Sequence, residues 1–186
     1  MQMDTGLDTG DIWSHHPCMI TSDDTAKSLH DRLALLGAET LMAHLQSCHP
    51  PFLSELRRTR QNNTLATYAA KLTKSEGVMD WSLSALDLER RVRAFNPWPI
   101  AYTHLHAQAL RIWGACTVRE KNFSLLQNPG TILSATSAGI DVATGDGILR
   151  LLSIQLPGGI PLTAAEFLNA HPPAALIGLR LGIVET

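Results

Sequence analysis

The residue of this sequence best placed for acid–base chemistry is Asp8, which lies between two glycine-containing turns. The tripeptide Asp-Thr-Gly occurs at 4–6 and again at 8–10, and glycine at these positions predicts a sharply bent loop. A carboxylate held on such a loop can accept a proton from a reacting group. A loop aspartate that only hydrogen-bonds its own turn has the same spacing, so both interpretations stay open.

Histidines and cysteines raise the possibility of a metal site. His104 and His106 are two residues apart in a strand-like pattern, so both are expected on one face, where two imidazoles could begin such a site. Five further ligand-type residues lie in the N-terminal part: His15, His16, His44, Cys48 and His49. Their spacing lacks the ordered pairs of a zinc site. We therefore interpret all of these as surface or packing residues and expect no metal.

Cations and tryptophans near the middle of the chain could contact nucleic acid. The cations are Lys71, Lys74, Arg90, Arg91 and Arg93. Each could contact a phosphate, although a solvated helix face is the ordinary alternative. The tryptophans are Trp81, Trp98 and Trp113. They could stack on bases, but we favour core packing because tryptophan buries a large area.

The composition is that of a chain that folds. It has 186 residues, 45% hydrophobic and 17% charged, which excludes wholesale disorder. The net charge of −2 does not by itself indicate nucleic-acid binding. Three cysteines without a CxxC pair favour a reducing cytoplasm. Every apolar run is far shorter than the roughly 20 residues that a bilayer requires, so no membrane association is expected.

The N-terminal part is expected to hold one strand and one long helix. A strand-like run covers 12–20, and a helix is expected to begin near residue 22. Leucines recur at helical spacing over 29–45, as one amphipathic helix or as two pieces joined at Gly37. The proline pair at 50–51 is expected to end it.

The C-terminal part is expected to be rich in short strands. A second helix should begin at the N-cap Ser84 and end at the Asn-Pro-Trp-Pro segment 96–99. Five apolar runs then predict strands at 101–106, 110–118, 130–134, 139–143 and 148–156. The turn residues 144–147 predict a hairpin, and a short helix is expected over 163–169. This number of short strands suggests a small antiparallel barrel or sandwich.

Several segments, in order, resemble one family of enzymes. Residues 1–11 resemble the loop of folate-dependent formyltransferases, and 69–76 with the Asp-Trp pair 80–81 resemble the entry to their C-terminal domain. The segment Arg-Ala-Phe-Asn-Pro-Trp-Pro at 93–99 is similar to the signature of the methionyl-tRNA formyltransferases. Residues 129–132 and 142–147 follow in that family's order, so the resemblance covers nearly the whole chain.

The resemblance implies transfer of a formyl group from 10-formyltetrahydrofolate to the amino group of initiator methionyl-tRNA. In the family, an aspartate of the Leu-Asp-Thr-Gly loop assists proton transfer near the folate, while an Asn and a His stabilise the oxyanion. Asp8 matches that aspartate. The resemblance also suggests that the five cations named above contact tRNA. A cytoplasmic monomer without a metal is expected.

The resemblance further implies an α+β chain with three parts. We expect residues 1–50 to be the C-terminal remnant of an α/β formyltransferase catalytic domain and 51–68 to be an exposed linker. We expect 69–186 to be an OB-like antiparallel β-barrel with a flanking helix, which contacts tRNA. The family's Asn and His lie upstream of the Asp8 loop, so the chain is expected to be truncated and inactive alone.

Two consequences and two alternatives follow from this interpretation. Residues 1–50 are expected to be poorly stabilised, because their helix would lack the sheet on which it packs. One alternative is a non-enzymatic tRNA-binding module. The other is a different folate-dependent formyltransferase acting on another amine, against which the segment 93–99 argues.

Overall fold

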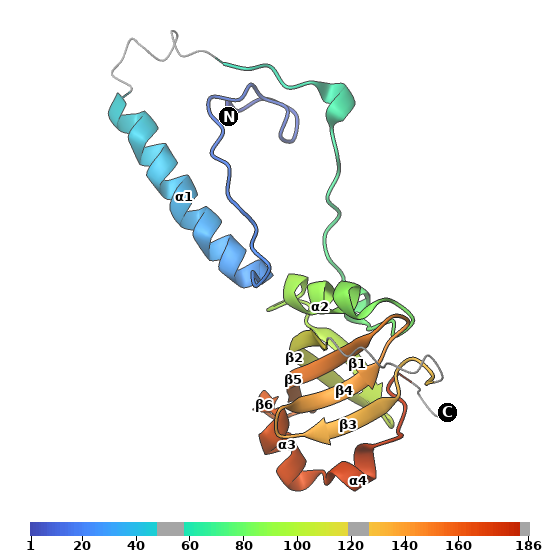
Figure 1. Cartoon of the computed structure of the whole chain (residues 1–186). Coiled ribbons are helices and arrows are strands. Elements are labelled where there is room, and N and C mark those ends of the chain that lie inside the picture. The colour runs from blue at the N-terminus through green and yellow to red at the C-terminus, as the bar shows by residue number, and fades with distance from the viewer. Residues whose placement is uncertain (48–57, 119–126, 183–186) are drawn as a thin grey trace. The chain divides into compact units, whose positions relative to one another are not determined.

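The computed structural model describes residues 1–47, 58–118 and 127–182, and the chain divides into two compact units. The first comprises residues 1–24 and 28–71, and the second comprises 25–27 and 72–186. A long helix, α1, dominates the first unit, whereas the second contains a twisted sheet with short helices (Figure 1).

The helix α1 spans Ala26–Ser47 and continues through Gly37 without a break, which confirms the single-helix alternative. An added side chain at Gly37 would meet no neighbouring atom, so the helix does not require glycine there. The predicted end of the helix at 50–51 lies outside the described residues. Leu35, Leu41 and Leu45 of α1 are all exposed.

The strand predicted over 12–20 is wrong. Only Ile12 is paired, in a bridge with Thr59 whose two backbone hydrogen bonds both measure 2.9 Å. The run 12–20 is strand-like in composition, but a strand also needs a neighbour with which to pair. The first unit supplies that neighbour at a single position within its described residues. A 3-10 turn, η2, follows at Asn63–Leu65.

The second unit begins with a 3-10 turn, η3 (Lys74–Gly77), and the helix α2 (Ala85–Ala94). Ser84 is the N-cap of α2, as predicted, because its hydroxyl accepts the backbone N–H of Asp87 at 3.1 Å. This bond satisfies one of the N–H groups that have no partner inside the helix.

Six strands and two short helices complete the second unit. The strands are β1 (Ala101–Leu105), β2 (Gln108–Val118), β3 (Ile132–Thr136), β4 (Gly139–Ala143), β5 (Ile148–Gln155) and β6 (Leu162–Thr163). The helices are α3 (Ala164–Ala170) and α4 (Pro173–Leu176). The five predicted strands and the predicted helix at 163–169 are confirmed to within three residues, whereas β6 and α4 were not predicted.

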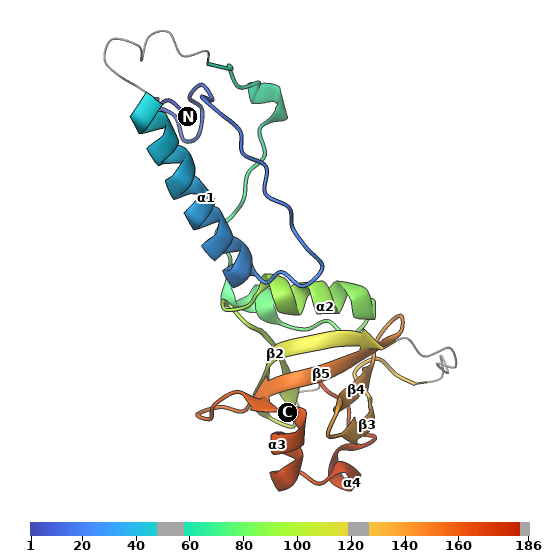
Figure 2. The same ribbon diagram turned by 60° about the vertical axis from the view of Figure 1, so that its left-hand side comes forward.

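The strands form one antiparallel sheet in the order β1-β2-β5-β4-β3, with β6 paired to β5. The predicted hairpin at 144–147 is confirmed, since it joins the paired strands β4 and β5. Figure 2 shows the sheet curling over α3. Among the described strands, β1 and β3 do not pair, so the sheet is open and a closed barrel is not confirmed.

The core lies between the inner face of the sheet and the helices. Its largest fully buried apolar side chains are Phe167, Leu88, Ile112, Leu149, Leu151, Ile154, Val92 and Val142. They come from α2, α3 and the strands β2, β4 and β5. Because side chains alternate between the two faces of a strand, the burial of these residues also determines which strand residues face outward. None of the described helices is both long and apolar enough to cross a bilayer.

Candidate functional site

Asp8 lies in the exposed N-terminal loop, where its backbone has a positive φ of 54°. Left-handed backbone is uncommon outside glycine, although aspartate tolerates it better than most residues. Leu7 beside it is 96% exposed. The loop therefore presents Leu7 and Asp8 to solvent.

Gln61 and Gly10 hold this loop in shape. The side-chain amide of Gln61 donates to the carbonyls of Asp8 at 2.8 Å and Gly10 at 2.7 Å. The backbone N–H of Gln2 donates to the carbonyl of Asp11 at 2.7 Å, which closes the loop. A Cβ at Gly10 would lie 1.8 Å from the carbonyl oxygen of Gln2, so only glycine fits there. The Asp-Thr-Gly spacing predicted this bend, but no sequence signal indicated Gln61.

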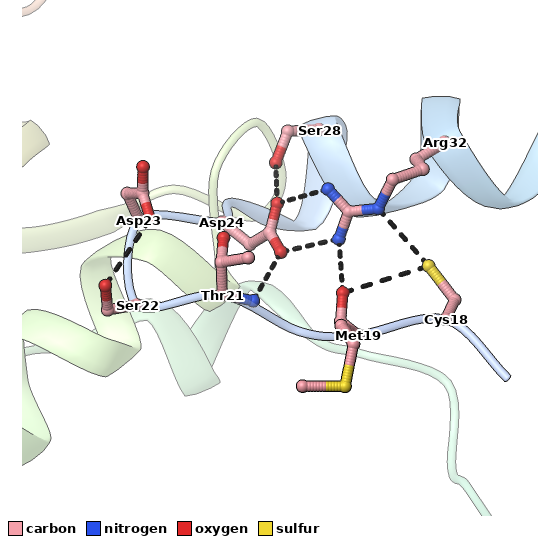
Figure 3. A network of polar contacts seen from close by, with 8 residues as sticks. All are labelled: Cys18, Met19, Thr21, Ser22, Asp23, Asp24, Ser28 and Arg32. Carbon is pink, nitrogen blue, oxygen red and sulfur yellow. Dashed lines mark hydrogen bonds and ion pairs between the residues drawn. The ribbon is translucent and has the colours of Figure 1, made fainter.

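Asp24 and Arg32 fasten the extended segment to α1 (Figure 3). Arg32 donates from Nη1 to Asp24 Oδ1 at 2.9 Å and from Nη2 to Oδ2 at 2.6 Å. The carboxylate also accepts the backbone N–H of Thr21 at 2.7 Å and the hydroxyl of Ser28 at 2.8 Å. The Arg32 guanidinium, with the Thr21 N–H, holds the pKa of Asp24 far below its usual range. The same bond raises the pKa of Arg32.

Arg32 also holds the residues that precede Asp24. Its Nη2 donates to the carbonyl of Met19 at 2.7 Å and its Nε to Cys18 Sγ at 3.2 Å. Sequence reasoning missed this network, because a separation of eight residues between Asp24 and Arg32 matches no helical pairing. The network fixes the direction in which the chain enters α1.

A groove of about 600 Å³ runs along α1 in the first unit, with Leu33, Leu36 and Leu41 among its lining. Within it, Ser14 Oγ and His44 Nε2 are 2.7 Å apart, and the ring of His16 meets His44 edge-on at 6.5 Å. His16 is exposed and His44 is half-buried, which agrees with their interpretation as surface or packing residues. Cys48 and His49 lie outside the described residues.

The prediction that His104 and His106 share one strand face is wrong. Strand β1 ends at Leu105, and His106 lies in the following turn with a φ of 53°. The alternation of a strand therefore stops before it. Within residues 1–47, 58–118 and 127–182, no group of three or more His, Cys, Asp or Glu side chains could hold a metal ion.

Two of the predicted phosphate contacts are in ion pairs on α2. Arg90 Nη1 is 3.6 Å from Asp87 Oδ1, and Arg93 Nε is 3.8 Å from Glu89 Oε1. The Arg90 side chain is well exposed, whereas that of Arg93 is largely covered. The exposed Arg90–Asp87 pair is of the kind that contributes little to stability.

Arg91 and Lys74 lie on neighbouring elements of the second unit. Arg91 Nη2 donates to the carbonyl of Glu76 at 3.1 Å, which ties α2 to the η3 turn that carries Lys74. The Arg91 guanidinium also lies over the ring of Phe95, 5.7 Å from its centroid. Lys74 is exposed. Lys71 is exposed and is the last residue of the first unit.

The three tryptophans of the second unit differ in burial. Trp81 is in the core, as predicted, and its Nε1 donates to Thr103 Oγ1 at 3.0 Å. Trp98 is 47% exposed, so the prediction of core packing is wrong for it, because it lies in the loop between α2 and β1 rather than on an apolar face. Trp113 is half-buried.

Comparison with known proteins places these elements in a family. Residues 71–172 match the model of the formyl transferase C-terminal domain. A methionyl-tRNA formyltransferase of Coxiella burnetii is 45% identical over 171 residues, which are 92% of this chain and 52% of that protein. One from another strain of the same organism is 44% identical over the same length. The chain thus spans about half the length of these curated relatives.

Solved structures show the same fold at low identity. A variant of HypX from Aquifex aeolicus has a TM-score of 0.63 at 16% identity, covering 90% of this chain and 29% of that protein. HypX from Aquifex aeolicus in complex with tetrahydrofolic acid has a TM-score of 0.62 at 17% identity, covering 89% of this chain and 28% of that one. With the relatives above, these findings show that the chain belongs to the formyl transferase family and corresponds to the C-terminal portion of the methionyl-tRNA formyltransferases.

Proposed function

We propose that this chain works as the C-terminal portion of a methionyl-tRNA formyltransferase, which moves a formyl group from 10-formyltetrahydrofolate to the amino group of initiator methionyl-tRNA. The observation that carries the proposal is the 45% identity over 92% of the chain to an enzyme of that name. In this interpretation, residues 1–50 belong to the catalytic domain, 51–68 form the linker, and 69–186 form an OB-like tRNA-contacting domain.

Asp8 is the residue to which we assign the proton transfer. As the methionyl amine attacks the formyl carbon, its nitrogen gains positive charge and must lose a proton, while the folate nitrogen gains one as it leaves. The exposed Asp8 carboxylate can reach both reactants, because the amide of Gln61 donates to the backbone carbonyls of Asp8 and Gly10 and not to this carboxylate. Its left-handed backbone, held at the carbonyl by Gln61, would direct the carboxylate away from the loop. We also assign to Asp8 contact with the bound folate donor.

A carboxylate can accept that proton but cannot stabilise the oxyanion that forms on the formyl carbon. An ionised carboxylate has no hydrogen to donate, and a negative group beside an oxyanion raises its energy. Hydrogen-bond donors from outside the Asp8 loop are therefore required. We propose that the 186-residue chain alone does not transfer a formyl group at a measurable rate.

The second unit is assigned to tRNA. Lys74, Arg90, Arg91 and Arg93 come from η3 and α2, which Arg91 ties together, and Lys71 precedes them in sequence. Cations attract the phosphate backbone without reading its sequence, so their contribution should weaken as salt rises. We further propose a monomer that acts in the cytoplasm, where the free thiols of Cys18 and Cys116 would stay reduced.

The test is formylation of methionyl-tRNA with 10-formyltetrahydrofolate by two proteins. One is the 186-residue chain, and the other is a chimera that joins it to the part of the Coxiella burnetii relative outside the 171 aligned residues. We expect activity from the chimera only. Asp8→Asn in the chimera should reduce kcat by about 10²–10⁴-fold, the usual contribution of a positioned proton acceptor.

Three results would contradict parts of this proposal. Activity of the short chain would show that the oxyanion donors lie within it. Full activity of the Asp8→Asn chimera would remove Asp8 from the proton transfer. An inactive, folded chimera whose 186-residue portion binds tRNA would instead favour a non-enzymatic tRNA-binding module.

A further inference from the structure

The outer side of the sheet at β1, β2 and β5 carries a group of aromatic rings. Two of them, His104 and Trp113, were separate candidates in the sequence, for a metal site and for base stacking. On β1, Ala101, Thr103 and Leu105 are buried, so Tyr102 and His104 face outward between them and are half-buried. Their rings meet edge-on with centroids 5.9 Å apart.

The strand register places a cation and a third ring beside them. Arg111 on β2 is paired directly with Tyr102 on β1 and with Gln155 on β5, so the three side chains share the outer face. Trp113 reaches the same face, because its Nε1 donates to Gln155 Oε1 at 2.8 Å. We call this surface, made of Tyr102, His104, Arg111, Trp113 and Gln155, the aromatic face.

Backbone hydrogen bonds and a buried neighbour hold the strands of the aromatic face in place. Asn96 in the loop after α2 donates from Nδ2 to the carbonyl of Trp113 at 3.0 Å. The backbone N–H of Met79 donates to the carbonyl of Tyr102 at 2.8 Å. Ile112, between Arg111 and Trp113, is completely buried. The rings are therefore fixed by backbone and core contacts before any partner arrives, which reduces the entropy lost on binding.

We propose that the aromatic face binds unpaired nucleotides of RNA, with bases stacked on Tyr102 and Trp113 and a phosphate held by Arg111. This inference rests on the proposed function, which makes tRNA the partner of the second unit. Sheets that present aromatic side chains are a recurrent way to bind single-stranded RNA, because every base has a flat face on which a ring can stack.

Charge complementarity favours RNA over an apolar protein partner. Arg111 is exposed and permanently charged, and none of the five residues of the aromatic face is acidic. Gln155 offers an amide, and its Nε2 donates to the carbonyl of Gly159 at 2.7 Å, so its oxygen stays directed at Trp113. An apolar partner would have to desolvate Arg111 without a counter-charge.

The test measures the binding of a short unpaired RNA oligonucleotide to the 186-residue chain by fluorescence anisotropy, beside a blunt RNA duplex and an initiator tRNA transcript. We expect the oligonucleotide to bind more tightly than the duplex and to quench tryptophan fluorescence. Tyr102→Ala and Arg111→Ala should each raise Kd about tenfold, within the range seen when one stacked base is lost. Tyr102→Phe keeps the ring and should change Kd less than about twofold.

Ile177→Ala is the matched control, because Ile177 is 50% exposed and follows α4 in the same unit. It should leave Kd unchanged, and thermal melting of every variant shows whether the fold is kept. If the tRNA binds but the oligonucleotide does not, or if Tyr102→Ala and Arg111→Ala bind like the parent, the aromatic face is not an RNA site and the proposed function stands. If no RNA binds, the tRNA role of the proposed function fails, and this inference fails with it.

Discussion

Removal of the Arg150 side chain should destabilise the sheet that carries the aromatic face. Ser134, Asp141 and Arg150 form one row across β3, β4 and β5, since Asp141 is paired with Arg150 on one side and with Ser134 on the other. Arg150 donates from Nε to Asp141 Oδ1 at 2.6 Å and from Nη2 to Oδ2 at 2.8 Å. The Ser134 hydroxyl donates to Oδ2 at 2.9 Å.

The size of this loss in stability depends on how deeply the Asp141 and Arg150 side chains are buried. The Asp141 side chain is 10% exposed and that of Arg150 is 29% exposed. Removing one partner of a fully buried pair costs about 3–5 kcal/mol, because the other charge is left without compensation. Here, Ser134 still donates to Asp141, and the partly exposed Arg150 is screened by solvent. We therefore expect Arg150→Ala to lower the free energy of unfolding by about 2–3 kcal/mol.

Urea unfolding followed by tryptophan fluorescence measures this loss, because Trp81 is buried in the same unit. Arg150→Met is the informative control. The aliphatic part of Arg150 lies against Gly139, and methionine keeps most of that contact while removing the charge. Both variants should lose similar stability. If Arg150→Met unfolds at the same urea concentration as the parent, the ion pair contributes nothing and packing alone explains the alanine variant.

Three further outcomes follow from other contacts. Ser84→Ala should lower the free energy of unfolding by about 1 kcal/mol, since the cap of α2 is lost, whereas Ser84→Thr, which keeps the hydroxyl, should retain most of that stability in urea titrations. The pKa of Asp24 is lowered in the folded chain, so its stabilising effect is complete above the ordinary aspartate pKa and is lost as the pH falls below about 4. A pH titration of α1 helicity by circular dichroism should show this loss, and Asp24→Asn should flatten it. Gly10→Ala should force the Gln2 carbonyl away and open the Asp8 loop. Faster hydrogen exchange at the Gln2 N–H, which donates to Asp11, would report that opening.

Most of the second unit could be predicted from sequence because its signals are local. Ser84 before an apolar helical spacing marks the start of α2, and the Thr-Gly-Asp-Gly turn at 144–147 marks the β4–β5 hairpin. For the segment 12–20, local signals gave the wrong prediction. Its composition is strand-like, but among the described residues Ile12 alone of this segment is paired, and pairing depends on chain that is distant in sequence.

The candidate sites show the same division between local and distant information. Two glycines predict the bend at Asp8. The side-chain hydrogen bonds that hold this bend come from Gln61, more than fifty residues later in the sequence. Arg90 and Arg93 were predicted to contact phosphates, with a solvated helix face as the alternative. Their partners Asp87 and Glu89 lie three and four residues away, at distances that helical spacing could have indicated.

The aromatic face depends on a strand register that no single segment contains. Alternation along β1 would have shown that Tyr102 faces away from the core, but only the register of β1 on β2 shows that Arg111 lies beside it. A shift of one residue in that register would turn Arg111 to the core face and replace it with an apolar residue. The register is held by the buried Ile112, which is paired with Ala101 on one side and Ile154 on the other. The apolar residues that make the fold therefore also decide which charge and which rings meet on its outer surface.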